Sequence, residues 1–210
     1  MTQPRRVVCW RHGQTDWNAE KRFQGHTDIP LNDTGRAQAE HAARLLSALR
    51  PDAIVASDLR RAADTAAALS RRTGLPVEHD KGLRERSGGL WEGLTGAEIR
   101  ERWPEEHARW EIPEGEDLAA VAERVAEAVL RHLAAVPEGG VLVVASHGAA
   151  LRAGIAHLLG LPAEHRDALG PLDNCAWSVL GPRRHDGDGW RLLEHNAGTL
   201  PAEPQLSDDR

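Results

Sequence analysis

Two stretches of the sequence decide the fold: Val7-Val8-Cys9-Trp10-Arg11-His12-Gly13 near the amino terminus, and Val141-Leu142-Val143-Val144-Ala145-Ser146-His147-Gly148 in the second half. Each is an apolar run that is typical of a buried strand, followed at once by a histidine and a glycine. In an open α/β sheet, ligands bind at the carboxyl ends of the strands. The two histidines are therefore expected to converge on one crevice.

Outward from these strands, apolar runs alternate with amphipathic segments along most of the chain. This alternation predicts an α/β fold: a three-layer sandwich with a mostly parallel central sheet and helices on both faces. The expected strands cover residues 7–10, 53–56, 77–79, 141–145, 175–180 and 190–193. The expected helices run from a cap at Asp33 or Thr34 towards Pro51, and over residues 59–72, 95–103, 117–136 and 149–159.

Several local patterns make this prediction more specific. Apolar positions in the first long helix predict that Ala37, Ala42, Leu45 and Leu49 form its buried stripe. Ser57-Asp58 is expected to cap the second long helix.

The domain organisation follows from composition. We expect a single domain over residues 1–199, with a short cap insertion near 95–116 and a poorly ordered tail at 200–210.

Charge and cysteine content limit the partners. The 26 basic and 32 acidic residues give a net charge of −6 with the signs interspersed, so a nucleic-acid partner is not expected and any anion site must be local. Cys9 and Cys175 lie in apolar runs and are interpreted as small core residues. With no secretory signal or membrane-length apolar stretch in the sequence, the expected location is the cytoplasm, without a membrane partner.

The chemistry begins with arginine and histidine at strand ends. Arg11 precedes His12, and Ser57-Asp58-Leu59-Arg60-Arg61-Ala62 brings arginine to the same edge of the sheet. A guanidinium can hold two phosphoryl oxygens, and a helix amino terminus adds N–H donors. This pattern favours a site for a tetrahedral anion, although Arg11-His12 alone fits a surface pair equally well and one of Arg60 and Arg61 is expected to be solvated.

An imidazole beside a bound phosphoryl group can act as a nucleophile. Nearby guanidinium charges disfavour the imidazolium and keep His12 neutral, so that it could form a phosphohistidine that water hydrolyses. The leaving alkoxide needs a proton, and Glu85 could donate it. From the residues alone, Glu85 fits an ordinary ion-paired loop residue at least as well.

Other active-site classes lack their sequence patterns. No His-Glu-x-x-His motif, Cys-x-x-Cys pair or Asp/His cluster has metal-ligand spacing, so we expect no metal and no cofactor. Neither a phosphate-binding Gly-x-x-x-x-Gly-Lys loop nor a Gly-x-Ser-x-Gly nucleophile turn is present.

Four blocks in order and spacing closely resemble the histidine phosphatase superfamily, phosphoglycerate mutase-like branch. The blocks are residues 11–18 (RHGQTDWN), 57–66 (SDLRRAADTA), 83–85 (LRE) with 91–95 (WEGLT), and 146–148 (SHG). The resemblance implies a hydrolase of small phosphorylated metabolites, without a metal or cofactor. It also implies His12 as the phosphorylated nucleophile, Arg11 and Arg61 as phosphoryl ligands, His147 as a further pocket residue and Glu85 as the proton donor. Asn18, Gln24, Gly25 and Gly148 fall where family members contact phosphate or substrate.

Several reactions and substrates are compatible with this resemblance. The short, acidic insertion at 100–116 and Ala149 after His147-Gly148 differ from cofactor-dependent mutases, which favours hydrolysis over mutase activity. Within the family, the sequence is similar to glucosyl-3-phosphoglycerate phosphatases, and such enzymes often form homodimers. A broad-specificity sugar phosphatase, an α-ribazole-phosphate phosphatase or a non-catalytic phospho-ligand binder would carry similar residues.

Overall fold

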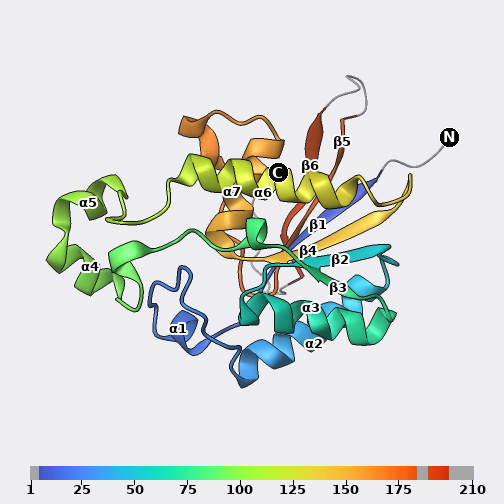
Figure 1. Cartoon of the computed structure of the whole chain (residues 1–210), viewed down its shortest axis with the longest axis horizontal. Coiled ribbons are helices and arrows are strands. Elements are labelled where there is room, and N and C mark those ends of the chain that lie inside the picture. Colours follow the sequence, from blue (N-terminus) through green and yellow to red (C-terminus); the bar gives the residue numbers. More distant parts are fainter. Residues whose placement is uncertain (1–4, 184–188, 199–210) are drawn as a thin grey trace, which may run out of the picture.

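The computed structural model describes residues 5–183 and 189–198, so the expected tail at 200–210 lies outside the described residues. Its centre is a six-stranded sheet in the order β3-β2-β4-β1-β5-β6 (Figure 1). The strands are β1 (Arg6–Arg11), β2 (Ala53–Ala56), β3 (Val77–His79), β4 (Val141–Ser146), β5 (Trp177–Pro182) and β6 (Trp190–Ala197). Strands β1 to β4 pair in parallel, whereas β5 and β6 are antiparallel additions at one side. The predicted mostly parallel sheet is confirmed.

The register of the sheet brings the histidine-bearing strand ends together. Arg11 of β1 lies opposite Ser146 of β4, so His12 and His147 leave the sheet side by side. Ala56 of β2 pairs with Ala145 from the other side of β4, which places Ser57 at the same edge. The residues that directly follow these three parallel strands therefore lie close together.

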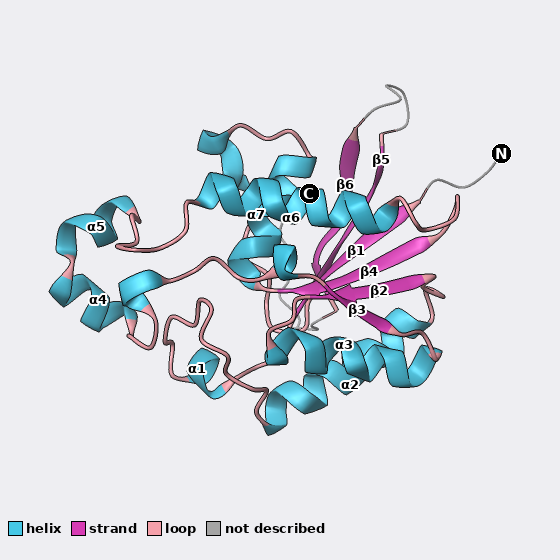
Figure 2. Ribbon diagram, in the orientation of Figure 1, coloured by secondary structure: helices cyan, strands magenta, loops and turns pink. Residues whose placement is uncertain are grey.

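Helices cover both faces of this sheet (Figure 2). One face packs against α2 (Asp33–Ser47) and α3 (Arg60–Thr73), and the other packs against α6 (Leu118–Leu133) and α7 (Gly148–Leu158). Alternate residues of β1 enter the two cores: Val7 faces α6 and α7, whereas Val8 faces α2 and α3. The predicted three-layer sandwich is confirmed.

The remaining elements are short. They are α1 (Asp16–Ala19), α4 (Gly96–Arg102), α5 (Pro104–Arg109) and the 3-10 helices η1 (Lys81–Leu83), η2 (Gly89–Trp91) and η3 (Ala163–Ala168). Thr95 caps α4 as predicted: its hydroxyl accepts from the Glu98 N–H, and the Glu98 carboxylate accepts from the Thr95 N–H. Helices α4 and α5 project beyond the strand ends, within the expected cap insertion (Figure 1).

The predicted stripe of α2 is wrong at two positions. Ala37 is exposed and Leu45 is 43% exposed, whereas the buried residues are Gly35, Ala39, Ala42, Ala43 and Leu46. Small residues dominate because α2 packs closely against α3 and the sheet. The N-cap of α2 is Asn32, whose side chain accepts from Gly35 N–H, and not Asp33 or Thr34.

The predicted cap of α3 is also wrong. The N-cap is Leu59, without a side-chain cap, because Ser57 and Asp58 have tertiary partners. The Ser57 hydroxyl is hydrogen-bonded to His147, and Asp58 forms a bidentate ion pair with Arg84. Ser57 keeps one local contact, because its hydroxyl also accepts from Leu59 N–H at 3.3 Å, but neither residue is the N-cap of the helix.

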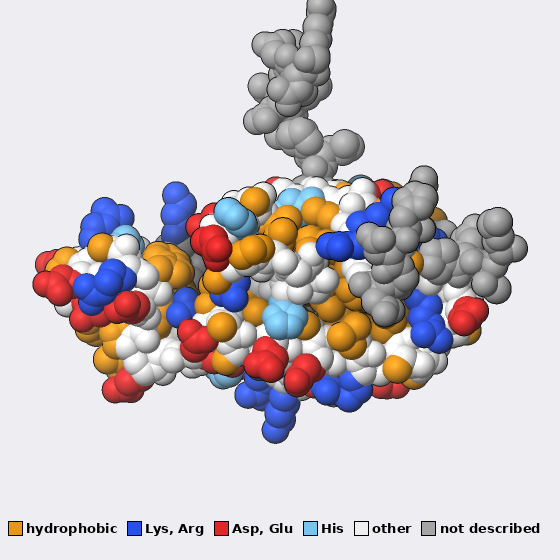
Figure 3. Space-filling model, turned by 90° about the horizontal axis from the view of Figure 1, so that it is seen from above, with side chains coloured by type: hydrophobic (Ala, Val, Ile, Leu, Met, Phe, Trp, Pro, Cys, Tyr) orange, Lys and Arg blue, Asp and Glu red, His pale blue; other side chains and the backbone are white. Residues whose placement is uncertain are grey.

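The surface agrees with the interspersed charges of the sequence. Figure 3 shows acidic and basic side chains intermixed over the face seen from above. None of the helices in the described part of the chain is both long and apolar enough to cross a bilayer.

Candidate active site

A polar cavity of about 190 Å³ opens where the parallel strands end. Residues from four separate parts of the chain line it: Arg11, His12, Asn18, Arg22, Phe23, Gln24, Gly25, Arg61, Glu85, Arg86 and Ala149. The structure thus brings most of the predicted site residues to one cavity. His147 and Gly148 are not part of its lining; they contact the lining residues from behind.

His12 follows β1 and is only 2% exposed. Its Nδ1–H donates to the Gly13 carbonyl at 2.6 Å, which leaves the lone pair on Nε2. Burial and the charges of Arg61 and Arg11 hold the pKa of His12 well below its usual range, although the Gly13 hydrogen bond opposes this shift. The site therefore contains a neutral imidazole with one basic nitrogen free.

His147 is fully buried beside His12, with the ring centroids 5.2 Å apart. Its Nδ1 accepts a hydrogen bond from Arg61 Nε at 3.2 Å, so its proton resides on Nε2, which donates to Ser57 Oγ at 2.8 Å. Burial, followed by the charge of Arg61, holds the pKa of His147 well below its usual range. Both ring nitrogens are thus engaged, Nδ1 by Arg61 and Nε2 by Ser57.

Arg61 is completely buried, although it lies in the first turn of α3. Besides its bond to His147, its Nη1 donates to the Thr27 carbonyl at 2.9 Å and its Nη2 donates to the Gly25 carbonyl at 2.8 Å. Burial lowers the pKa of Arg61 to about 10. Arg60, by contrast, is exposed, so the structure separates the two adjacent arginines as predicted.

Arg11 has hydrogen-bond donors without partners. Its Nη1 donates to the Leu172 carbonyl, but its buried Nε has no partner among the described residues. A Cβ at Gly148 would lie 3.3 Å from that Nε, so glycine at position 148 allows the close approach of the α7 backbone. A buried guanidinium with a free N–H at a cavity is a binding site for an anion.

Glu85 reaches the amino terminus of α7. Its Oε1 accepts from the N–H groups of Arg86 and Ala150, both at 2.8 Å, while Oε2 accepts only from Ala149 N–H at 3.2 Å. These contacts fix the carboxyl group at the cavity wall. Oε2 is the less engaged oxygen and the one that can carry a proton.

The amides of Asn18 and Gln24 are oriented by a shared neighbour, Thr15. Asn18 Oδ1 accepts from Thr15 N–H at 3.1 Å and from Asn174 Nδ2 at 3.2 Å, whereas Gln24 Oε1 accepts from the Thr15 hydroxyl at 3.0 Å. Asn174 also donates to the His12 carbonyl at 3.1 Å. With both carbonyl oxygens occupied, the NH₂ groups of Asn18 and Gln24 are the donors that remain for a ligand.

Glu92 organises the loop that carries Gly25, and the sequence reasoning missed this role. Its two carboxylate oxygens accept from the N–H groups of His26, Thr27 and Gly88 and from the Thr27 hydroxyl. Burial opposes the ionised form, but these hydrogen bonds prevail and lower the pKa of Glu92. The only signal in the sequence was its place in the block 91–95.

Two further arginines, also missed, line the cavity. Arg22 is held by Glu20 at 2.7 Å and by the Gly93 carbonyl at 2.8 Å. Arg86 is 7% exposed, and its Nε donates to the Glu116 carbonyl at 2.7 Å. Together with Arg11 and Arg61 they make the cavity positive in a chain of negative net charge. The net charge of the whole chain could not indicate a positive charge that is confined to one cavity.

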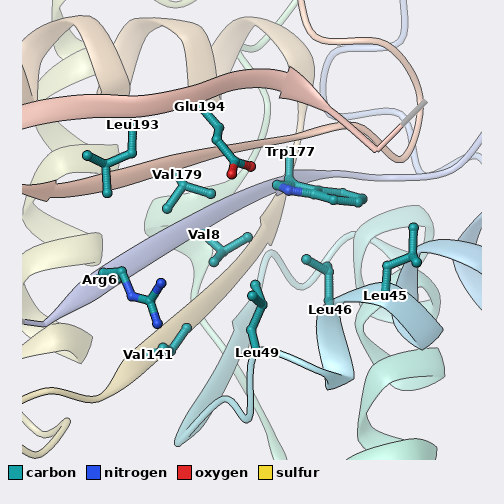
Figure 4. A pocket seen from close by; sticks show the side chains of 10 residues that line it. All are labelled: Arg6, Val8, Leu45, Leu46, Leu49, Val141, Trp177, Val179, Leu193 and Glu194. Atoms are coloured by element: carbon teal, nitrogen blue, oxygen red, sulfur yellow. The ribbon is translucent and has the colours of Figure 1, made fainter. Parts of the chain in front are cut away.

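The described residues contain no group of three or more His, Cys, Asp or Glu side chains that could hold a metal ion. A second, largely apolar cavity of about 290 Å³, which we call the α2–β6 groove, is shown in Figure 4. It is lined by Arg6, Val8, Leu45, Leu46, Leu49, Val141, Trp177, Val179, Leu193 and Glu194. It contains neither histidine nor cysteine, and its composition suits packing and not catalysis.

Comparison with known proteins agrees with the site. The model of the histidine phosphatase superfamily (branch 1) matches residues 7–198. The glucosyl-3-phosphoglycerate phosphatase of Mycolicibacterium vanbaalenii is 40% identical, over 96% of this chain and 99% of that protein. A protein of Serratia proteamaculans named "Probable phosphoglycerate mutase GpmB" is 37% identical, over 88% of this chain and 89% of its own.

A solved structure of mycobacterial glucosyl-3-phosphoglycerate phosphatase in complex with VO3 superposes with a TM-score of 0.87 at 40% identity. The match covers 92% of this chain and all of that one. With a family model that spans nearly the whole described fold, and relatives this similar in both sequence and structure, the chain belongs to branch 1 of the histidine phosphatase superfamily.

Proposed function

We propose that the protein is a phosphomonoesterase that hydrolyses a small phosphorylated metabolite through a phosphohistidine at His12. The observation that carries the proposal is the neutral His12 ring, whose Nδ1 donates to Gly13 while Nε2 keeps its lone pair beside Arg11 and the buried Arg61. This combination suits a nucleophile next to a tetrahedral dianion.

In the first step, the Nε2 lone pair of His12 attacks phosphorus and the bond from phosphorus to the ester oxygen breaks. Glu85 gives a proton from Oε2 to the departing alkoxide. Arg11, Arg61 and the amides of Asn18 and Gln24 hold the non-bridging oxygens, with Gly25 and Gly148 keeping the backbone close. Their donors are fixed before the reaction and stabilise the charge of the transition state.

In the second step, water attacks the phosphohistidine and the Glu85 carboxylate takes its proton. The bond between phosphorus and Nε2 breaks, so His12 recovers its lone pair and inorganic phosphate leaves. His147 acts as a positioning residue, because its neutral ring accepts from Arg61 and keeps that guanidinium in place. The guanidinium groups supply the positive field that a metal supplies in other phosphatases, so the mechanism uses no metal or cofactor.

For the substrate we propose glucosyl-3-phosphoglycerate. The support is the name of the mycobacterial relatives and the charge of the cavity. Arg22 and Arg86 add positive charge next to the phosphate ligands, which suits a substrate with a carboxylate close to its phosphate.

The test is release of inorganic phosphate from glucosyl-3-phosphoglycerate, 3-phosphoglycerate, α-ribazole phosphate and common sugar phosphates. We expect the highest kcat/KM for glucosyl-3-phosphoglycerate, no turnover by His12→Ala, and an acid-labile phosphoenzyme trapped by rapid quenching of the wild type. A stable complex with an unhydrolysed phospho-ligand would instead indicate a binding protein.

Mutase activity is the second candidate, because a relative at 37% identity carries that name. Against it, Ala149 lines the cavity directly behind Glu85 and offers no side-chain donor to retain a phosphoglycerate. Product analysis with 3-phosphoglycerate distinguishes the two: free phosphate supports hydrolysis, and isomerised phosphoglycerate supports the mutase.

We further propose a homodimer formed through the α2–β6 groove. Leu45 and Leu193, 43% and 41% exposed, lie in this groove together with Arg6 and Glu194. A two-fold interface presents the same patch twice, so Arg6 of one copy can face Glu194 of the other. Light scattering should give a dimer for the wild type and a monomer for Leu45→Asp/Leu193→Asp; a monomeric wild type contradicts the proposal.

The expected location in the cytoplasm also stays a proposal. Its support is the pair of cysteines, both free and buried, which a reducing compartment preserves. Cell fractionation with an antibody against the protein tests it.

A further inference from the structure

A third cavity, of about 300 Å³, lies beside the phosphate cavity and has no assigned role. We call it the aromatic cleft; its lining is Trp17, Asn18, Lys21, Arg22, Phe23, Leu94, Gly96, Ile99, His107 and Trp110. Asn18, Arg22 and Phe23 line both cavities, so the two lie next to each other. A ligand whose phosphate lies at His12 can therefore extend into the aromatic cleft.

The two walls of the aromatic cleft come from different elements. Trp17 belongs to α1 and packs against Gly93, where an added Cβ would lie 3.3 Å from the indole ring. Ile99 belongs to α4, and His107 to α5, the two helices of the expected cap. The cap thus supplies one wall of the aromatic cleft.

Trp110 is unusual in both backbone and exposure. It ends α5 with φ 54° and ψ 34°, a left-handed conformation that bulky residues rarely adopt, and it is 51% exposed. Its ring is supported by the fully buried Trp91 at 5.4 Å and by His107 at 5.6 Å between ring centroids. A large apolar ring held in a strained conformation at a cavity suggests a function in binding.

The side chains that line the aromatic cleft indicate which class of ligand it can bind. Indole rings present flat apolar surfaces, whereas Lys21, Asn18 and His107 add polar groups around them. A pyranose ring matches this combination, because it has an apolar C–H face and a rim of hydroxyl groups. A purely apolar group would leave the polar groups without partners.

We propose that the aromatic cleft binds the hexose ring of a glycosylated phosphoglycerate and that Trp110 determines this specificity. The proposal rests on the proposed phosphatase function, because it requires the phosphate to lie at His12. The contact with Trp110 is remote from phosphorus and the same in ground and transition states, so it contributes to KM and not to kcat.

The first test compares Trp110→Ala with the wild type on two substrates. The KM for glucosyl-3-phosphoglycerate should rise about tenfold with kcat little changed, whereas kcat and KM for 3-phosphoglycerate, which lacks the sugar, should stay the same. Trp110→Phe should restore most of the affinity. Leu90→Ala, which removes another exposed apolar side chain near the cap but outside both cavities, is the matched control.

The second test does not require turnover. Calorimetric titration of glucosyl-3-phosphoglycerate into His12→Ala and into His12→Ala/Trp110→Ala should give a dissociation constant about tenfold higher for the latter. If the wild type hydrolyses nothing while this difference persists, the proposed function is wrong but the hexose subsite stands. Equal dissociation constants, or an equal loss on both substrates in the first test, overturn the role of Trp110.

Discussion

At the scale of the residue, the site depends on two histidines that stay neutral for different reasons. His12 donates from Nδ1 to a carbonyl and keeps Nε2 free, whereas His147 has both nitrogens engaged by Arg61 and Ser57. A proton added to His147 Nδ1 would face the N–H of Arg61. Protonation of His147 would therefore break its hydrogen bond with Arg61, whereas protonation of His12 would place a charge next to Arg11 and Arg61.

This neutrality predicts a pH dependence of stability. The pKa values of His12 and His147 are both lowered in the folded state, so below about pH 6.5 the unfolded chain binds protons that the folded chain excludes. The free energy of unfolding should fall with decreasing pH, by about 1.4 kcal/mol per pH unit for each histidine. Urea unfolding between pH 7.5 and 5.5 measures it. The His12→Gln variant should lose the contribution of His12 to this pH dependence. The His41→Gln variant, changed at an exposed position, should keep the full dependence.

Glu85→Gln separates proton donation from capping. Glutamine keeps an oxygen for the N–H groups at the start of α7 but has no proton to donate, so kcat for an alkyl phosphate should fall about 10²–10³-fold. Turnover of p-nitrophenyl phosphate should fall much less, because p-nitrophenolate leaves without a proton. An equal fall with both substrates would contradict proton donation by Glu85 to the leaving group.

At the scale of the element, the loop after β1 makes close backbone contact with the start of α2. A Cβ at Gly35 would lie 2.0 Å from the Gln14 carbonyl oxygen, and one at Gly13 would lie 2.4 Å from the Gly35 carbonyl oxygen. The position of His12 therefore depends on a helix that contributes no group to the cavity lining.

Gly35→Ala should displace this loop and lower kcat/KM by about 10–100-fold, with a loss of about 1–3 kcal/mol in the free energy of unfolding. Phosphatase kinetics and urea unfolding measure the two effects. The control is Gly170→Ala, where an added Cβ has no atom within 4 Å. Unchanged kinetics in Gly35→Ala would mean that the loop adapts without moving His12.

The elements that the sequence predicted well are those with a strong local signal. The central strands, such as β2 and β4, are buried on both faces, so they are continuous apolar runs. Strand β2 begins and ends where predicted, and so does the more exposed edge strand β3. Helices α1 and α5 are too short to show a periodicity, and the stripe of α2 was misjudged because close packing favours alanine over leucine. The end of β5 nearest the site also differs: Cys175, expected in the strand, has φ 60° and lies before it.

The site was predicted to a similar degree and for related reasons. Residues at strand ends, such as His12 and His147, are visible in the sequence because topology alone brings them together. Glu92 and Asn174 could not be identified from local pattern, because their roles lie in hydrogen bonds to residues far away in the sequence. Ser57 also suits the N-cap of a helix, so its hydrogen bond with His147 could not be predicted from the local sequence.

At the scale of the whole molecule, the accessibility of the two buried cysteines measures how often the core unfolds. Burial raises the pKa of both Cys9 and Cys175 to about 12, so neither is a thiolate near neutral pH. An aromatic disulfide reagent should label neither thiol in the native protein and both after unfolding. Labelling should follow the rate of global unfolding, and rapid labelling of either thiol in the native protein would contradict the buried positions.

The charge of the molecule gives a second prediction at this scale. Because arginine supplies the positive field, EDTA should leave kcat/KM unchanged within error, while added inorganic phosphate should inhibit competitively. Inhibition by EDTA that a divalent cation reverses would contradict the mechanism. The measurement needs only steady-state phosphate release.

The antiparallel strand β5 lies beside β1, and the turn before it touches the site: Asn174 donates to the His12 carbonyl across 162 positions of the sequence. His12 thus receives this neighbour only when the far end of the polypeptide has been made. During synthesis, a growing chain that still lacks this turn would have His12 but an incomplete pocket. Catalysis should therefore begin only after residues near 180 have left the ribosome. The onset of phosphate release would then mark the completion of folding.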